Sequence, residues 1–189
     1  TLFNLRRMLM NKSFIIKIIL LCLVTIKVSA IEKVILFGDS LMAGYGLPNE
    51  QHLSVVLQNN LSLEGHNIDI INGSVSGSTS AGGLNIAEWT LSEPSIDLMI
   101  LCLGANDMLR GINPKETKNN LEEIIKIAKS KNIKVIIAGM IAPTSYGFEY
   151  KKSFDTIFFD LSKKYKLQLI PFLLEGVAQK PEFNLSDGM

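Results

Sequence analysis

A serine that directly follows an apolar segment is the residue of this chain best suited to chemistry. Ser40 lies in the sequence Phe-Gly-Asp-Ser-Leu at residues 37–41, immediately after the apolar run at residues 34–36. A serine on the sharp exit of a buried strand can be presented as a nucleophile, although its hydroxyl stays weak until a base removes the proton. The sequence therefore predicts nucleophilic attack by Ser40 on a substrate.

Two further segments contain groups that could stabilise the charge that such an attack creates. Acyl transfer places negative charge on the former carbonyl oxygen, and each preset hydrogen-bond donor to this oxyanion is typically worth about 10²–10³ in rate. Gly77 could offer a backbone N–H without a Cβ in the way, and Asn106 could offer its side-chain amide. From the residues alone, an ordinary turn glycine and an asparagine that caps or turns the chain remain open alternatives.

The elements that must position these residues are predicted by an alternation of apolar runs and helical stripes. Short apolar runs predict strands at residues 33–37, 68–71, 98–103, 133–138 and 167–170. Helical spacing predicts helices at residues 48–63, 83–91, 114–130 and 150–165. Strands that are apolar on both faces indicate a three-layer α/β/α fold, a five-stranded parallel sheet with helices on both sides.

The three polar segments follow the first three predicted strands. Reactive groups in open parallel sheets lie outside the carboxyl ends of the strands. Ser40 follows the first strand, Gly77 follows the second, and Asn106 follows the third. We therefore expect these three residues to lie at one edge of the sheet and to form a single site.

The first thirty residues have the pattern of a secretory signal peptide. They contain five basic residues and no acidic one, are almost wholly apolar between residues 13 and 28, and end in Val-Ser-Ala. We expect cleavage after Ala30 and a periplasmic or secreted protein. An uncleaved anchor is the alternative, but Lys17 and Lys27 leave few uninterrupted apolar residues for a span of about 20. Because Thr1 is not a start residue, we expect residues 1–9 to precede the true start.

The remaining composition excludes several classes of function. Residues 31–189 are long enough for one domain, carry a net charge of about −4, and have no basic stripe that would indicate nucleic-acid binding. Cys102 is the single cysteine of this region and lies inside an apolar run, so we expect a small buried residue rather than a catalytic thiol. No histidine or cysteine cluster has metal-ligand spacing, and we expect neither a metal nor a cofactor.

The three polar segments together resemble the first three sequence blocks of the SGNH (GDSL) hydrolases. The matching residues are 38–41, 74–77 and 104–107, with further local matches at 43–46, 78–80 and 106–111. The resemblance runs from about residue 32 to the end and is closest to the periplasmic thioesterase I, arylesterase and lysophospholipase branch. It implies the flavodoxin-like SGNH hydrolase fold and a serine esterase that cleaves acyl esters or thioesters through an acyl-enzyme intermediate.

The resemblance also implies roles for individual residues. Ser40 would be the nucleophile, and the oxyanion hole would consist of the backbone N–H groups of Ser40 and Gly77 and the side-chain amide of Asn106. The substrate would be a small acyl ester or thioester, with transient contact to a lipid substrate and no partner protein. The fourth block of the family is Asp-x-x-His, and residues 187–189 look like its first three residues. Asp187 would then orient the imidazole that activates Ser40.

The histidine of that fourth block would directly follow Met189. We therefore expect the hydrolase domain at residues 31–189 to be incomplete at its C-terminus and the base to lie at the next position of a longer protein. His52 and His66 are expected to be exposed or capping residues, and without the base this piece should be nearly inert. The alternatives are a carbohydrate or peptidoglycan O-acetylesterase and a catalytically inactive binding domain of the same fold.

Several other side chains near the site have two interpretations. Asp39 and Asp107 could be a carboxylate pair or metal ligands, but we expect them to bond backbone groups and hold the loops. The aromatic residues Tyr146, Phe148 and Tyr150 follow the fourth strand. They either line the acyl or aryl side of the substrate pocket or belong to a loop without contact to substrate.

Overall fold

The computed structural model describes residues 31–178 and 180–183 of the chain. The signal-peptide prediction for residues 1–30 and the predicted role of Asp187 lie outside these residues. Within the described part, no helix is long and apolar enough to cross a membrane.

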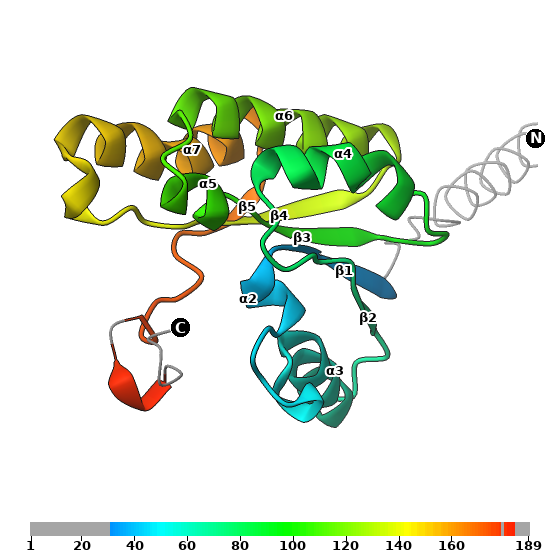
Figure 1. Cartoon of the computed structure of the whole chain (residues 1–189). Helices are drawn as coiled ribbons and strands as arrows, with labels where there is room; N and C mark the ends of the chain where they lie inside the picture. Colours follow the sequence, from blue (N-terminus) through cyan, green and yellow to red (C-terminus); the bar gives the residue numbers. More distant parts are fainter. Residues whose placement is uncertain (1–30, 179, 184–189) are drawn as a thin grey trace, which may run out of the picture. The chain divides into compact units, whose positions relative to one another are not determined.

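The centre of the domain is a parallel sheet of five strands in the order β2-β1-β3-β4-β5 (Figure 1). The strands are β1 (Lys33–Gly38), β2 (Asp69–Asn72), β3 (Leu98–Cys102), β4 (Lys134–Ala138) and β5 (Gln168–Ile170). Leu36 of β1 pairs with Asn72 of β2, and Gly38 pairs with Cys102 of β3. The first three strands therefore end side by side, which places the segments that follow them at one edge.

Helices cover both faces of this sheet, as Figure 1 shows. The short α2 (Ser40–Ala43) and α3 (Leu53–Leu63) lie on one face, and α4 (Ser80–Thr90), α6 (Pro114–Ser130) and α7 (Phe148–Tyr165) lie on the other. The helix α5 (Ala105–Leu109) follows β3, and single 3₁₀ turns are η1 (Asn49–Gln51), η2 (Thr144–Tyr146) and η3 (Pro181–Phe183). The predicted three-layer fold is confirmed.

The apolar stripe of α6 shows why this sequence folds as it does. Leu121, Ile124, Ile125 and Ala128 recur at helical spacing, and all four are fully buried. Asn113 caps the helix by accepting a hydrogen bond from the N–H of Lys115, and Pro114 occupies the first turn, where its missing N–H has no partner to lose. The expected bounds 114–130 are those observed.

The expectation for Cys102 is also confirmed. Its side chain is buried at the end of β3 and belongs to the hydrophobic core. Burial raises the pKa of the thiol, because the thiolate would lose its hydration in this position. Cys102 therefore packs as a small apolar residue.

Candidate active site

The junction of β1 and α2 presents Ser40 at the carboxyl end of the sheet. Asp39 caps α2, with its Oδ1 accepting a hydrogen bond from the N–H of Leu41 at 3.1 Å. A Cβ on Gly38 would come 2.6 Å from the carbonyl oxygen of Cys102, so only glycine lets the turn approach β3 this closely. Ser40 itself is partly exposed.

The loop that follows β2 is fastened to the end of β1. The N–H of Val75 donates to the carbonyl oxygen of Gly38 at 3.0 Å. The hydroxyl of Ser74 donates to the carbonyl oxygen of Leu36, also at 3.0 Å. Through these bonds β1 stays paired with the chain after β2 has ended. They bring the loop that carries Gly77 beside the turn that carries Ser40.

Gly77 occupies the third position of a type II β-turn. The N–H of Ser78 donates to the carbonyl oxygen of Val75 at 3.1 Å, Gly77 has φ +77°, and Ser76 has no positive φ. A Cβ at position 77 would meet nothing within 4 Å, so glycine is required here by the backbone conformation and not by space. Within the described residues the N–H of Gly77 has no protein acceptor, which leaves it available to a ligand.

Asn106 lies on α5 and connects the other two segments. Its Nδ2 donates to the carbonyl oxygen of Ser78 at 3.1 Å and to Oδ2 of Asp39 at 3.4 Å. The structure thus brings the segments of Ser40, Gly77 and Asn106 into one hydrogen-bonded unit. Their roles in catalysis stay predictions.

Arg110 belongs to the same unit, although sequence reasoning did not single it out. Its Nη2 donates to the carbonyl oxygen of Gly77 at 3.0 Å. Its position four residues after Asn106 could have indicated this role, because side chains at that spacing lie on one face of a helix. Because α5 was not predicted, the spacing of Asn106 and Arg110 was not recognised as helical.

Asp107 connects the elements around the site through a set of buried hydrogen bonds. Its Oδ2 accepts from the N–H of Ser80 at 2.7 Å, and its Oδ1 accepts from the hydroxyl of Thr117 at 3.1 Å. The hydroxyl of Ser80 also donates to Oδ1, and Asp107 is completely buried. The expectation that Asp107 holds loops is confirmed, since it joins α5 to the starts of α4 and α6.

We expect Asp107→Ala to lower the free energy of unfolding by about 2–5 kcal/mol, because it leaves a buried N–H and two buried hydroxyls without their acceptor. Urea unfolding followed by circular dichroism measures this change. Asp160→Ala is the matched control, because Asp160 makes an exposed ion pair with Lys118 and its loss should cost about 1 kcal/mol or less. Equal urea midpoints for the two variants would show that the buried hydrogen bonds of Asp107 stabilise the fold no more than the exposed ion pair of Asp160 does.

Asp39 also holds a loop, and its environment sets its ionisation. Burial raises the pKa of this carboxyl group, while the hydrogen bonds from the N–H of Leu41 and the amide of Asn106 act in the opposite direction. Both donors favour the charged form of the Asp39 carboxyl group. The hydrogen bond between this group and Asn106 also orients the amide of Asn106. The expectation that Asp39 bonds backbone and loop groups is confirmed.

Neither histidine of the described region makes a hydrogen bond to Ser40 there. The ring of His52 packs against Gly44, and its Nε2 lies 3.1 Å from the carbonyl oxygen of Leu47. His66 is exposed, with its Nε2 3.9 Å from a carboxylate oxygen of Glu64. His66 agrees with the expectation of an exposed residue, whereas His52 is half-buried and occupies the N-cap position of α3 without a capping hydrogen bond from its side chain. The expected base and Asp187 lie outside the described residues.

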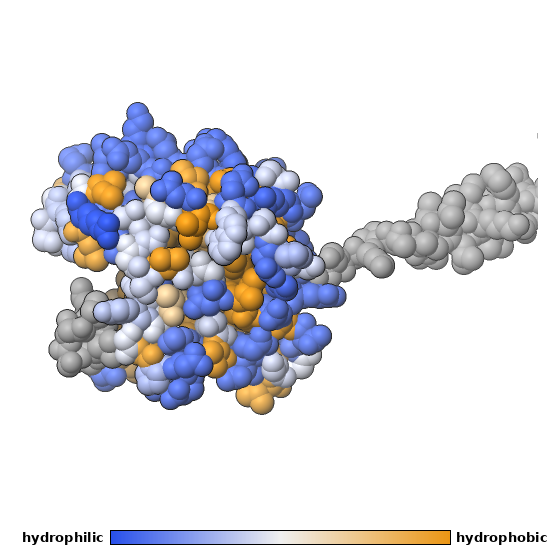
Figure 2. All heavy atoms as spheres, turned by 45° about the vertical axis from the view of Figure 1, so that its right-hand side comes forward, coloured by the Kyte–Doolittle hydropathy of each residue, from blue (hydrophilic) through white to orange (hydrophobic). Residues whose placement is uncertain are grey.

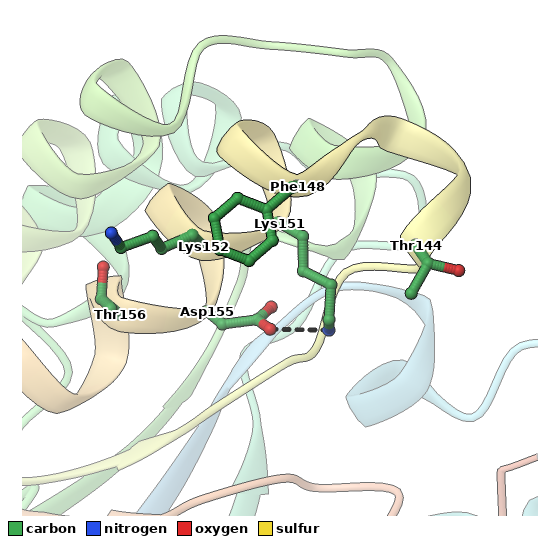
Figure 3. A pocket seen from close by; sticks show the side chains of 6 residues that line it. All are labelled: Thr144, Phe148, Lys151, Lys152, Asp155 and Thr156. Atoms are coloured by element: carbon green, nitrogen blue, oxygen red, sulfur yellow. Dashed lines mark hydrogen bonds and ion pairs between the residues drawn. The ribbon is translucent and has the colours of Figure 1, made fainter.

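A pocket of ≈ 530 Å³ opens beside the loop that follows β4 (Figure 3). The residues that line it are Thr144, Phe148, Lys151, Lys152, Asp155 and Thr156. Asp155 accepts from the N–H of Ala142 at 2.8 Å, and Nζ of Lys151 donates to the carbonyl oxygen of Ala142 at 2.7 Å. Lys151 and Asp155 also pair with each other at 2.7 Å, so one wall of the pocket is fixed to the loop.

The three aromatic residues that follow β4 separate into two groups, and two of them, Phe148 and Tyr150, lie on α7 and not on a loop. Phe148 is 74% exposed and lines the pocket, whereas Tyr146 stacks on Tyr150 with ring centroids 5.3 Å apart. The hydroxyl of Tyr150 donates to the carbonyl oxygen of Ile112 at 2.9 Å. Only Phe148 of the three is therefore part of the pocket wall, and Tyr150 joins α7 to the segment between α5 and α6.

Fold and site together are those of a serine hydrolase. A partly exposed serine at a strand-to-helix turn lies beside a free backbone N–H and a side-chain amide at the carboxyl edge of a parallel sheet. Residues 36–189 match the GDSL-like Lipase/Acylhydrolase family. The chain belongs to this family, and it is an esterase.

Known relatives agree with this assignment. The chain is 38% identical over 160 residues to an arylesterase of Vibrio mimicus, a match that covers 85% of this chain and 80% of the relative. It is 30% identical over 169 residues to the thioesterase 1/protease 1/lysophospholipase L1 of Escherichia coli K12, covering 89% and 80%. The crystal structure of AlinE4, an esterase of the SGNH-hydrolase family, superposes with a TM-score of 0.80 at 37% identity and covers 86% of this chain and 87% of AlinE4.

Proposed function

We propose that the protein hydrolyses small acyl esters or thioesters in two steps, with Ser40 as the nucleophile. The observation that carries the proposal is the hydrogen-bonded unit of three segments around the serine. It places the N–H of Gly77 and the amide of Asn106 beside the turn that presents Ser40. These are the groups that acyl transfer needs around a carbonyl carbon.

In the first step, Oγ of Ser40 attacks the carbonyl carbon while its proton passes to a base. The backbone N–H groups of Ser40 and Gly77 and the amide of Asn106 donate to the oxyanion that forms. Collapse of this intermediate releases the alcohol or thiol, which takes the proton from the base, and leaves an ester on Ser40. In the second step, water gives a proton to the base and attacks the ester; collapse of this intermediate returns the proton from the base to Oγ of Ser40 and releases the acid.

The base in this scheme comes from the family resemblance. A histidine after Met189, oriented by Asp187, would complete the site. Reading the next codon of the same frame checks this expectation. A different residue or a stop there would favour a binding domain of the same fold.

We assign the acyl or aryl side of the substrate to the pocket beside Phe148, because the neighbouring loop leaves the same edge of the sheet as the turn of Ser40. The volume of the pocket lies in the range of small-molecule pockets, about 300–1,000 Å³, and the loop beside it follows the carboxyl end of β4. On the face shown in Figure 2, hydrophobic side chains are interrupted by hydrophilic ones.

Acyl-chain profiling of the full-length protein tests the substrate class. We expect it to hydrolyse p-nitrophenyl esters from acetate to at least octanoate, and Phe148→Ala to raise KM for the longer chains several-fold. Strict preference for acetate would instead support the O-acetylesterase alternative. Absence of turnover on every ester, with the base present, would support the binding domain.

We also propose that the protein is exported and cleaved after Ala30. The support is the basic start, apolar centre and small final residues of segment 1–30. N-terminal sequencing of the exported protein should begin at Ile31, and a retained segment 1–30 in a membrane fraction would contradict cleavage.

A further inference from the structure

We propose that Arg110 is a positioning residue that keeps the oxyanion turn in place while Asn106 engages the substrate. The proposal rests on the proposed function. Arg110 directly follows α5, and its guanidinium donates to the carbonyl oxygen of Gly77 at 3.0 Å. Asn106 lies four residues earlier and donates to the carbonyl oxygen of Ser78 at 3.1 Å. Asn106 of α5 and the residue that caps this helix therefore hold two consecutive carbonyl groups of the loop.

These contacts anchor the type II turn of residues 75–78 on its exit side. On its entry side, the N–H of Val75 donates to the carbonyl oxygen of Gly38. The N–H of Gly77 belongs to the central peptide of the turn, which is the peptide that reverses between type II and type I turns. A turn held at both ends keeps this N–H at a fixed place relative to Ser40.

The need for Arg110 follows from the limited donors of Asn106. Its amide group has two N–H donors, and both have protein partners, Ser78 at 3.1 Å and Asp39 at 3.4 Å. Donation to an oxyanion must weaken at least one of these bonds. When the bond to Ser78 weakens, the hydrogen bond from the guanidinium of Arg110 to Gly77 still holds the exit side of the turn. A charged donor is suited to this task because its hydrogen bonds are the stronger ones.

The test compares Arg110→Met, which keeps an unbranched stem but no donor, with Arg110→Lys, which can still reach one carbonyl. Lys115→Ala is the control, because Lys115 is an exposed cation close in sequence to Arg110. Steady-state hydrolysis of p-nitrophenyl butyrate by the full-length protein gives kcat and KM. Stopped assays with a p-nitrophenyl phosphonate give the rate of Ser40 modification, and thermal unfolding gives Tm.

We expect Arg110→Met to lower kcat and the rate of phosphonylation each by about tenfold, with KM within about twofold and Tm close to that of Lys115→Ala. Arg110→Lys should recover most of the loss. In a Gly77→Ala background, Arg110→Met should lower kcat by much less than tenfold, because the donor it positions is already displaced.

Three results would overturn the proposal. The first is a kcat equal to that of Lys115→Ala, and the second is a raised KM with unchanged kcat, which would make Arg110 a substrate-binding residue. The third is a full tenfold loss in the Gly77→Ala background. If Arg110→Met does not fold, Arg110→Ala gives the same comparison. Failure of the proposed function itself is a separate result, since either the unchanged protein would turn over no ester or Ser40→Ala would remain active, whatever Arg110 does.

Discussion

Ser40→Ala is expected to lower kcat for p-nitrophenyl butyrate by about 10⁴-fold or more in the full-length protein. Removing the nucleophile of a serine hydrolase leaves only the acceleration that comes from binding and from the oxyanion donors. The substitution should not disturb the fold, because the cap of α2 is formed by the side chain of Asp39 and not by the hydroxyl of Ser40. Initial rates measured by release of p-nitrophenolate check the effect.

Ser130→Ala is a suitable control for this variant. Ser130 ends α6, where its exposed hydroxyl bonds, among the described residues, only the carbonyl oxygen of Ile127. We expect Ser130→Ala to keep the activity of the unchanged protein. If Ser40→Ala kept more than about a tenth of that activity, another group would have to be the nucleophile and the two-step scheme would be wrong.

Gly77→Ala is expected to have the second largest effect, a loss of about 10²–10³ in kcat. Gly77 has φ +77°, and an L-residue in this region costs roughly 1–2 kcal/mol. The variant can relieve this strain by turning the central peptide of the turn toward type I, which reverses the N–H of residue 77. One donor to the oxyanion would then point away from the substrate.

Gly65→Ala separates this effect from backbone strain in general. Gly65 has φ +83°, and like Gly77 it would meet nothing within 4 Å after addition of a Cβ. It lies between α3 and β2, at the other end of the second strand from the loop of Gly77. Both variants should lower Tm by similar amounts, but only Gly77→Ala should lower kcat. A similar kcat for both would remove Gly77 from the oxyanion hole.

The fold was predictable because its main elements are long or continuously apolar. The seventeen residues of α6 carry a complete amphipathic stripe, and β1 and β3 are almost entirely buried. The short helices α2 and α5 were not predicted, because four or five residues do not establish a helical period. The helix expected at residues 48–63 begins later, at Leu53, because η1 and an extended His52 precede it.

Only the residues of the site that directly follow the ends of strands were predictable. Ser40, Gly77 and Asn106 follow neighbouring parallel strands, so their convergence follows from the topology. The partners of Asp107 could not be predicted, since Ser80 lies 27 residues away and their meeting depends on how α4 and α5 pack. The contact of Arg110 with Gly77 could not be predicted either, because it depends on the direction of a single carbonyl group.

The most direct test of the central claim, that Ser40 is the nucleophile, is the site of covalent labelling. The full-length protein is incubated with a p-nitrophenyl phosphonate, and the product is analysed by intact mass and peptide mapping. We predict one adduct per chain, on Ser40, and no adduct on Ser40→Ala. Labelling of another residue, or an active esterase that takes up no label on Ser40, would contradict the account.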